Sequence, residues 1–172
     1  FKTFADISAE LGASSMGTQF AIFTHRDFDD PERRARLFDI AMDCWREVPE
    51  HAHAAGLTYL LLEPTSVGRE FAHPIENGGL LQGAIDAAGM AIPLEMMVDI
   101  DHGDVTSSNP ADIDPYAWAE AFPRKSPIIH IKQSSMNKGG HWPFTAAYNK
   151  DGRITPEKFL ETVRRGGVTV NE

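Results

Sequence analysis

Tyr59-Leu60-Leu61-Leu62-Glu63-Pro64 is the first of three short apolar runs that decide the fold. The other two are Pro93-Leu94-Glu95-Met96-Met97-Val98-Asp99 and Pro127-Ile128-Ile129-His130-Ile131-Lys132. Each run has the length of a strand and is largely apolar throughout, which is typical of parallel strands buried on both faces. Three residues that can bind a divalent metal, Glu63, Asp99 and His130, therefore fall at the C-terminal ends of successive predicted strands.

The spacing of these residues predicts the architecture. Glu63 and Asp99 are 36 residues apart, and Asp99 and His130 are 31 apart. A (β/α)₈ barrel uses about 31 residues per unit and keeps its active site at the C-terminal ends of its strands. The 172 residues contain four complete units, too few to close a barrel. The prediction is an α/β fold that is part of a TIM barrel, and an open doubly wound sheet is the alternative. The segment 168–172, which looks like the approach to another strand, and the absence of an initiator Met favour the partial barrel.

Turn and capping signals divide the chain into alternating strands and helices. We expect parallel strands with all helices on one side of the sheet, joined by crossovers. Pro49 is expected to kink or restart the first helix, and Gly56 to end its second part. The predicted strands are 16–24, 58–63, 91–99 and 127–132, the predicted helices are 31–47, 75–88, 115–122 and 156–165, and 25–30, 64–74 and 133–153 are predicted loops.

Composition limits the class of protein. The net charge of −9 and the pI near 5.2 disfavour nucleic acid and anionic membranes as partners, since both require clustered cations. No apolar run approaches 18 residues, so no membrane span is expected. No signal segment follows Phe1, and the single cysteine, Cys44, fits a reducing compartment. We therefore expect one cytoplasmic domain over 1–172, with a small-molecule partner and with a homo-oligomer left open.

Four stretches resemble a known family. The sequence Leu62-Glu63-Pro64-Thr65-Ser66-Val67-Gly68-Arg69-Glu70 resembles the sugar-phosphate isomerase/epimerase group, which has the xylose-isomerase-like TIM barrel. The stretches His130-Ile131-Lys132-Gln133, His141-Trp142-Pro143-Phe144-Thr145 and Tyr148-Asn149 are similar to the erythrulose-phosphate 3-epimerase branch of ketose epimerases. The resemblance covers essentially the whole chain, as strands four to seven of eight.

The resemblance implies a metal site. In the family, Glu, Asp and His after strands five, six and seven hold the metal, and these match Glu63, Asp99 and His130. Asp101 shares a strand face with Asp99 and is the rival ligand, but the family's Asp-x-x-His pattern, matched by Asp99 and His102, favours Asp99. Such an O,O,N set suits Mn²⁺, Mg²⁺, Co²⁺ or Zn²⁺. The family's fourth ligand, a Glu after strand eight that is also half of its acid/base pair, is not in this sequence, and neither are strands one to three.

The expected function is metal-dependent epimerisation of a small ketose phosphate, such as erythrulose phosphate, by proton transfer through an enediolate. Glu63 and His102 are the predicted catalytic residues. The predicted substrate and phosphate contacts are Lys132, His141 and Arg69, and Lys138 is a further cation in the same predicted loop as His141. One alternative is an aldose–ketose isomerase on the same scaffold. The other is an inactive partial barrel, since the chain taken alone lacks the second Glu.

Overall fold

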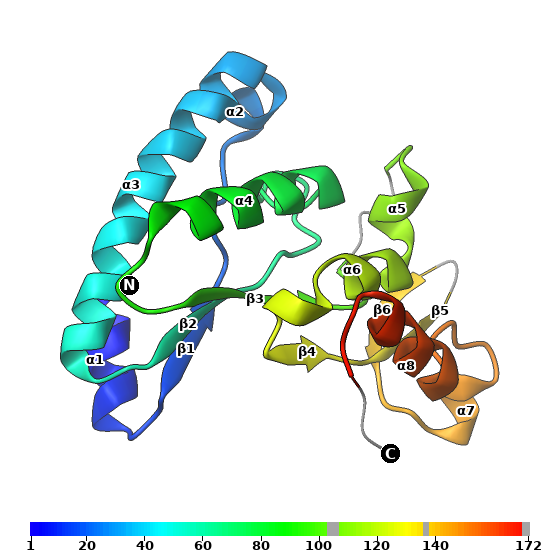
Figure 1. Cartoon of the computed structure of the whole chain (residues 1–172). Helices are drawn as coiled ribbons and strands as arrows, with labels where there is room; N and C mark the ends of the chain where they lie inside the picture. The colour runs from blue at the N-terminus through cyan, green and yellow to red at the C-terminus, as the bar shows by residue number, and fades with distance from the viewer. Residues whose placement is uncertain (103–106, 136–137, 170–172) are drawn as a thin grey trace.

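A computed structural model describes residues 1–102, 107–135 and 138–169, with only the backbone described at 138 and 139 (Figure 1). Its centre is a four-stranded sheet in the order β1-β2-β3-β4, and every neighbouring pair is parallel. Asp99 on β3 pairs in register with His130 on β4. The four predicted parallel strands are confirmed, at β1 (Ser15–Thr18), β2 (Tyr59–Leu62), β3 (Leu94–Asp99) and β4 (Ile128–His130).

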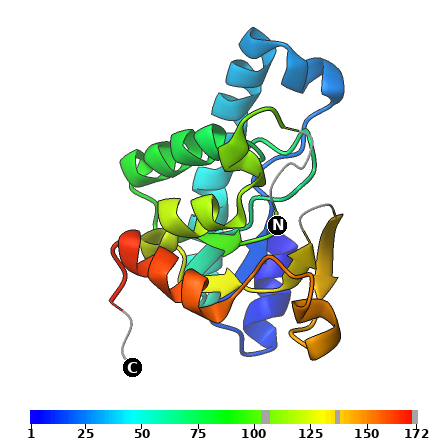
Figure 2. The same cartoon turned by 90° about the vertical axis from the view of Figure 1, so that its right-hand side faces the viewer.

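Helices connect and cover these strands, as Figure 1 shows. Turning the view by 90° shows that α8, at the C-terminal end of the chain, lies beside α6 (Figure 2). The helices are α1 (Lys2–Glu10), α2 (His25–Asp29), α3 (Pro31–Ala55), α4 (Ile75–Ala88), α5 (Pro110–Ile113), α6 (Pro115–Ala121), α7 (Ala146–Asn149) and α8 (Pro156–Arg165), with a 3₁₀ turn, η1, at Pro123–Lys125.

The two faces of the sheet differ in burial, as a curled half-barrel requires. Leu62, Met96 and Val98 point toward the helices and are at most 1% exposed. On the opposite face, Met97 is half-buried and Ile128 is 39% exposed. In a complete barrel this inner face is packed with side chains from all strands. The structure therefore confirms a partial barrel with helices packed against one face of its sheet.

Several helix ends follow their sequence signals. The Asp30 carboxylate accepts hydrogen bonds from the backbone N–H groups of Glu32 (3.0 Å) and Arg33 (3.2 Å), so it caps the N-terminus of α3. Gly56 ends α3 in the left-handed conformation, with φ 104°, which favours glycine. Helix α4 begins and ends where the sequence predicted it.

The prediction for Pro49 is wrong, because α3 continues through it to Ala55 as one helix. Pro49 is fully buried, and the neighbouring α3 residues Trp45, Val48 and Ala52 lie in the core. Since most helical stability in proteins comes from packing of the apolar face, burial offsets the hydrogen bond that proline cannot donate.

Helices α1 and α2 were missed by sequence analysis. Helix α1 has no side-chain N-cap, so no start signal marks it. Helix α2 does carry a signal, in a segment predicted to be a loop. The Thr24 hydroxyl accepts a hydrogen bond from the Asp27 backbone N–H (3.2 Å) and donates one to its carboxylate (2.7 Å). This reciprocal pattern resembles a capping box and could have been read from the sequence.

Two other segments differ from prediction. Strand β1 ends at Thr18, and the apolar residues that follow, Phe20 and Phe23, are buried in the core outside the strand. The predicted loop 133–153 contains an antiparallel hairpin, β5 (Gln133–Ser135) and β6 (Lys138–Trp142), followed by α7. Of the predicted strand approach at 168–172, residues 168 and 169 form no strand, and residues 170–172 lie outside the described chain.

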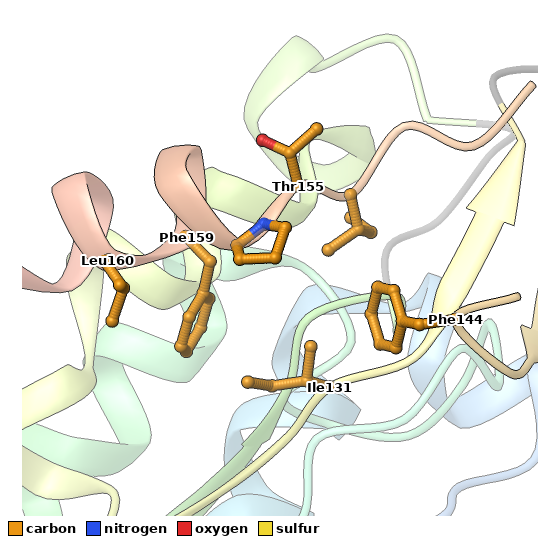
Figure 3. Close-up of a pocket in the computed structure, with 7 residues that line it drawn as sticks. Ile131, Phe144, Thr155, Phe159 and Leu160 are labelled. Carbon is orange, nitrogen blue, oxygen red and sulfur yellow. The ribbon is translucent and has the colours of Figure 1, made fainter. Parts of the chain in front are cut away.

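An apolar pocket lies between the β4–β5 connection and α8 (Figure 3). Its lining includes Ile131, Phe144, Phe159 and Leu160, and three of these side chains are more than a third exposed. None of the predicted site residues lines it. Among the described residues, no helix is both long enough and apolar enough to cross a membrane.

Candidate metal centre

The C-terminal ends of β2, β3 and β4 bring the three predicted ligands together. Each of Glu63, Asp99 and His130 offers one ligand atom, and these atoms all lie within 4.8 Å of one another. Glu63 directly follows β2, while Asp99 and His130 are the last residues of their strands. Parallel strands end at the same edge of a sheet, which explains how residues 36 and 31 positions apart in the sequence meet.

Asp99 is the most constrained member of this cluster. It is 5% exposed. Its Oδ1 accepts a hydrogen bond from the Asp101 backbone N–H (2.9 Å), and its Oδ2 accepts one from Lys132 Nζ (2.8 Å). These two bonds fix the plane of the carboxylate. The side chain of Asp101, the rival ligand, instead contacts Ser134 and Arg153.

Glu63 and His130 contact each other directly. His130 Nδ1 lies 3.1 Å from Glu63 Oε1 and 3.8 Å from Asp99 Oδ2. The side chain of His130 is 46% exposed, whereas that of Glu63 is 16% exposed. Of the three proposed ligands, His130 is therefore the most exposed.

His102 lies against the cluster. Its Nδ1 is 3.0 Å from the carbonyl oxygen of Pro64 and 3.4 Å from Glu63 Oε1. Its Nε2 lies 3.5 Å from Asp99 Oδ2. Burial lowers the pKa of His102, although the negative charges of Asp99 and Glu63 act in the opposite direction. Both ring nitrogens of His102 therefore face carboxylates of the cluster, Nδ1 toward Glu63 and Nε2 toward Asp99.

The side chains of Lys132 and His141 lie next to each other beside Asp99. Lys132 is 9% exposed, and its Nζ lies 3.2 Å from Nε2 of the exposed His141. The ring of His141 is also 6.1 Å from that of His102, measured between centroids. An ammonium has three donors, so the bond to Asp99 leaves Lys132 able to contact a further anion.

The other predicted substrate contacts do not reach the cluster by any described interaction. The Arg69 guanidinium donates to the carbonyl of Phe23 (2.9 Å), and the Arg69 carbonyl accepts from the Phe23 N–H (2.9 Å). These bonds hold the loop after β2 against the loop after β1. The side chain of Lys138 lies outside the described part of the chain.

The three ligands fit a divalent cation. Two carboxylates and one imidazole match the donor preference of Mn²⁺, Mg²⁺, Co²⁺ or Zn²⁺. Ligand atoms about 2.1 Å from one ion lie up to about 4 Å apart, so little closure is needed. The bonds to Asp99 from the Asp101 N–H and from Lys132 orient one ligand in advance, which is a common feature of metal sites.

Comparison with known proteins agrees with this fold. No protein-family profile matches the chain. A curated protein of Brucella abortus (strain 2308), named D-erythrulose 1-phosphate 3-epimerase, is 62% identical over all 172 residues. All 172 residues of the chain are therefore homologous to part of this epimerase. The match confirms the resemblance found in the sequence, and the chain spans 56% of the length of that relative.

Solved structures confirm the fold. A crystal structure from Rhodospirillum rubrum, assigned as a xylose isomerase, matches 98% of the chain and 55% of its own length, with a TM-score of 0.82 and 24% identity. A D-allulose 3-epimerase from Methylomonas sp. matches 81% of the chain and 46% of its own length, with a TM-score of 0.53 and 15% identity. At these identities the likeness shows the fold alone, a partial xylose-isomerase-like TIM barrel.

Sequence analysis missed a buried acid in the loop that follows Glu63. Glu70, in the loop after β2, is fully buried. Neither of its carboxylate oxygens has a well-formed hydrogen bond within the described chain, although backbone groups of Ala72, Thr65 and Ala21 lower its pKa somewhat. Desolvation outweighs them and raises the pKa of Glu70 to about 7. His73, in the same loop, is also buried, and its Nδ1 lies 3.2 Å from the Thr65 carbonyl oxygen.

Glu70→Gln is expected to stabilise the protein at pH 8 but not at pH 4. At pH 4 Glu70 is protonated in both folded and unfolded states, so its burial carries no charge penalty. Between pH 4.5 and 7 the unfolded chain ionises first, which favours unfolding. The free energy of unfolding of the wild type should therefore fall relative to the variant by about 3 kcal/mol from pH 4 to pH 8.

Urea unfolding at both pH values measures this difference. Glu76→Gln, the same chemical change at an exposed position of α4, is the control and should show no comparable gain. An equal pH dependence in both variants would contradict the assignment of a buried, uncompensated carboxylate to Glu70.

Proposed function

We propose that the protein is a metal-dependent epimerase of a small ketose phosphate, such as erythrulose phosphate. The observation that carries this proposal is the convergence of Glu63, Asp99 and His130 at the C-terminal ends of β2, β3 and β4. The 62% identical relative, named for its activity on D-erythrulose 1-phosphate, supports the substrate class.

The reaction moves a proton at a carbon next to a ketone, through an enediolate. A divalent ion held by Glu63, Asp99 and His130 would supply positive charge where the enediolate oxygens develop. In this proposal Glu63 is one proton-transfer group. His102, whose ring nitrogens lie near Glu63 and Asp99, holds a substrate hydroxyl or shuttles its proton. General acid–base catalysis of this kind contributes about 10²–10⁴-fold.

In this proposal the neighbouring side chains of Lys132 and His141 bind the substrate. A substrate phosphate would contact the exposed His141 and, beside it, the Lys132 ammonium. Charge-assisted bonds from such groups favour phosphorylated over free sugars. Arg69 is retained as a contact only for a substrate that extends toward the loop after β2.

The opposing acid/base group is expected outside these 172 residues. The family resemblance places that Glu after the eighth strand, and the chain spans 56% of the relative's length. The activity is therefore proposed for the full-length protein. We further propose a cytoplasmic location, since a small sugar phosphate is the expected substrate.

Solvent deuterium incorporation tests the proposal. The full-length protein, incubated with erythrulose phosphate and Mn²⁺ in D₂O, should incorporate deuterium at carbon 3 and yield the epimer. Removal of the metal with a chelator should stop incorporation, and Mn²⁺ should restore it. Formation of an aldose, with deuterium at the carbon next to its aldehyde group, would instead identify an aldose–ketose isomerase. Absence of exchange into both erythrulose phosphate and free ketoses would reject the epimerase function and the isomerase function.

A further inference from the structure

Asp101 and Arg153 form a buried ion pair next to the metal centre. The side chain of Asp101 is 1% exposed, and that of Arg153 is 9% exposed. The Arg153 Nη2 contacts Asp101 Oδ1, and the same oxygen accepts a hydrogen bond from Ser134 Oγ (2.5 Å). Asp101 Oδ2 accepts one from the backbone N–H of Gly140 (3.1 Å). Both carboxylate oxygens are thus occupied by groups from other segments of the chain.

Arg153 connects several segments through its other groups. Its Nε donates to Ser134 Oγ (2.9 Å), its Nη1 donates to the carbonyl of Ile113 (3.0 Å), and its backbone N–H donates to the carbonyl of Ser134 (2.9 Å). Burying two charges is costly, and apolar replacements of buried pairs are often no less stable. A pair with every partner satisfied is therefore better explained by what it positions than by stability alone.

The pair holds the β5–β6 hairpin, which carries part of the candidate site. Gly140, whose N–H donates to Asp101, directly precedes His141, and Ser134 lies two residues after Lys132. Lys132 directly precedes β5 and His141 lies on β6, and Asp101 forms hydrogen bonds with both strands. The Asp101 backbone N–H also donates to Asp99 Oδ1 (2.9 Å), so one residue orients both a metal ligand and the hairpin.

The adjoining segment strengthens this arrangement. Gln133, on β5, is 1% exposed, and its side-chain amide donates to Asn149 Oδ1 (3.0 Å) and to the Ile154 carbonyl (2.9 Å). Its Oε1 accepts from the Ile154 N–H (3.0 Å). The backbone of Gly152 lies so close to Gln133 that a Cβ there would overlap it. The hairpin is therefore fixed on its outer side by the same segment that supplies Arg153.

We infer that Asp101 and Arg153 are positioning residues, whose buried pair holds Lys132 and His141 in place to bind the anionic group of the substrate. The inference rests on the proposed function for the identity of the substrate. It assigns the pair no contact with the reacting atoms. Loss of the pair should loosen the hairpin and weaken anion binding, while Glu63, Asp99 and His130 keep their metal.

Asp101→Asn and Arg153→Lys in the full-length protein test this inference. Each keeps the approximate size of the side chain, and each removes the Arg–carboxylate geometry. We expect the KM for the ketose phosphate to rise about tenfold or more while kcat changes less than about threefold. The affinity for Mn²⁺ alone should stay within about twofold, and that for inorganic phosphate should fall about tenfold.

Arg165→Lys is the matched control. Arg165 also pairs with carboxylates, Glu120 and Glu161, but on the exposed surface of α8 away from the site. This variant should leave KM, phosphate affinity and Mn²⁺ affinity unchanged. Amide hydrogen exchange at Gly140 and His141 should accelerate in Asp101→Asn and Arg153→Lys and not in the control.

The outcomes separate the possibilities. Unchanged phosphate affinity and unchanged exchange at Gly140 would overturn the inference, as would a fall in Mn²⁺ affinity and thermal stability that equals the fall in phosphate affinity. If the wild type does not turn over a ketose phosphate but phosphate affinity and hairpin exchange respond as expected, the positioning role stands and the proposed function fails.

Discussion

Glu63→Gln in the full-length protein is expected to abolish solvent deuterium incorporation into erythrulose phosphate, with a loss of about 10²–10⁴-fold. The change keeps the shape of the side chain but removes its basicity and one negative charge from the metal cluster. Since the Glu63 side chain is 16% exposed and lies 3.1 Å from His130 Nδ1, the amide can keep this contact and the fold should persist. Exchange is followed by NMR, and circular dichroism checks the fold.

Glu47→Gln is the control for this prediction. Glu47 pairs with Lys2 (2.9 Å) on the exposed surface between α3 and α1, so the same chemical change there should leave exchange unaltered. Full exchange in Glu63→Gln would exclude Glu63 as a proton-transfer group. Restoration of exchange by excess Mn²⁺ would instead show that Glu63 serves only as a ligand.

Lys132→Met is expected to raise the KM for a phosphorylated ketose by about 10–100-fold and to change that for a free ketose little. Methionine keeps much of the length of the buried stem and removes the ammonium that faces His141 and Asp99. Charge-assisted bonds to phosphate are stronger than neutral ones, so their loss should fall on the phosphorylated substrate. Steady-state kinetics on both substrate types measure the difference.

The contact between Lys132 and Asp99 provides the contrasting outcome. If the ammonium acts mainly by orienting Asp99, the variant should lose Mn²⁺ affinity and activity equally on both substrate types. That result would contradict the phosphate role. Lys158→Met, at an exposed lysine of α8 whose Nζ lies 4.0 Å from the centre of the Tyr116 ring, is the matched control and should leave both KM values unchanged.

Local signals in the sequence were sufficient for much of the fold. Side-chain caps at Asp30 and Thr155 and the C-terminal Gly56 act within a few residues, so they predict helix ends without knowledge of the tertiary structure. The apolar runs likewise predicted β2 and β3 to within three residues at each end. Predictions failed where distant packing decides, as at Pro49, whose burial among core residues keeps α3 continuous.

The β5–β6 hairpin is a second feature that local sequence signals did not predict. Its strands are short and polar, so neither apolar alternation nor a turn signal marks them. Asp101 and Arg153, which lie outside the hairpin, form hydrogen bonds with them. Such a contact joins residues more than 15 positions apart, and no local pattern encodes it.

The sequence by itself determined which residues gather at the edge of the sheet. Parallel strands in successive βα units end on the same side, so Glu63, Asp99 and His130 had to meet there. Strand periodicity alone could not separate Asp99 from Asp101, because residues two apart in a strand share a face, and only the family pattern with His102 favoured Asp99. Only the tertiary structure decided this, since β3 ends at Asp99 and the chain turns. Beyond that turn the two-residue period no longer holds, and Asp101 is drawn instead to the buried cation of Arg153.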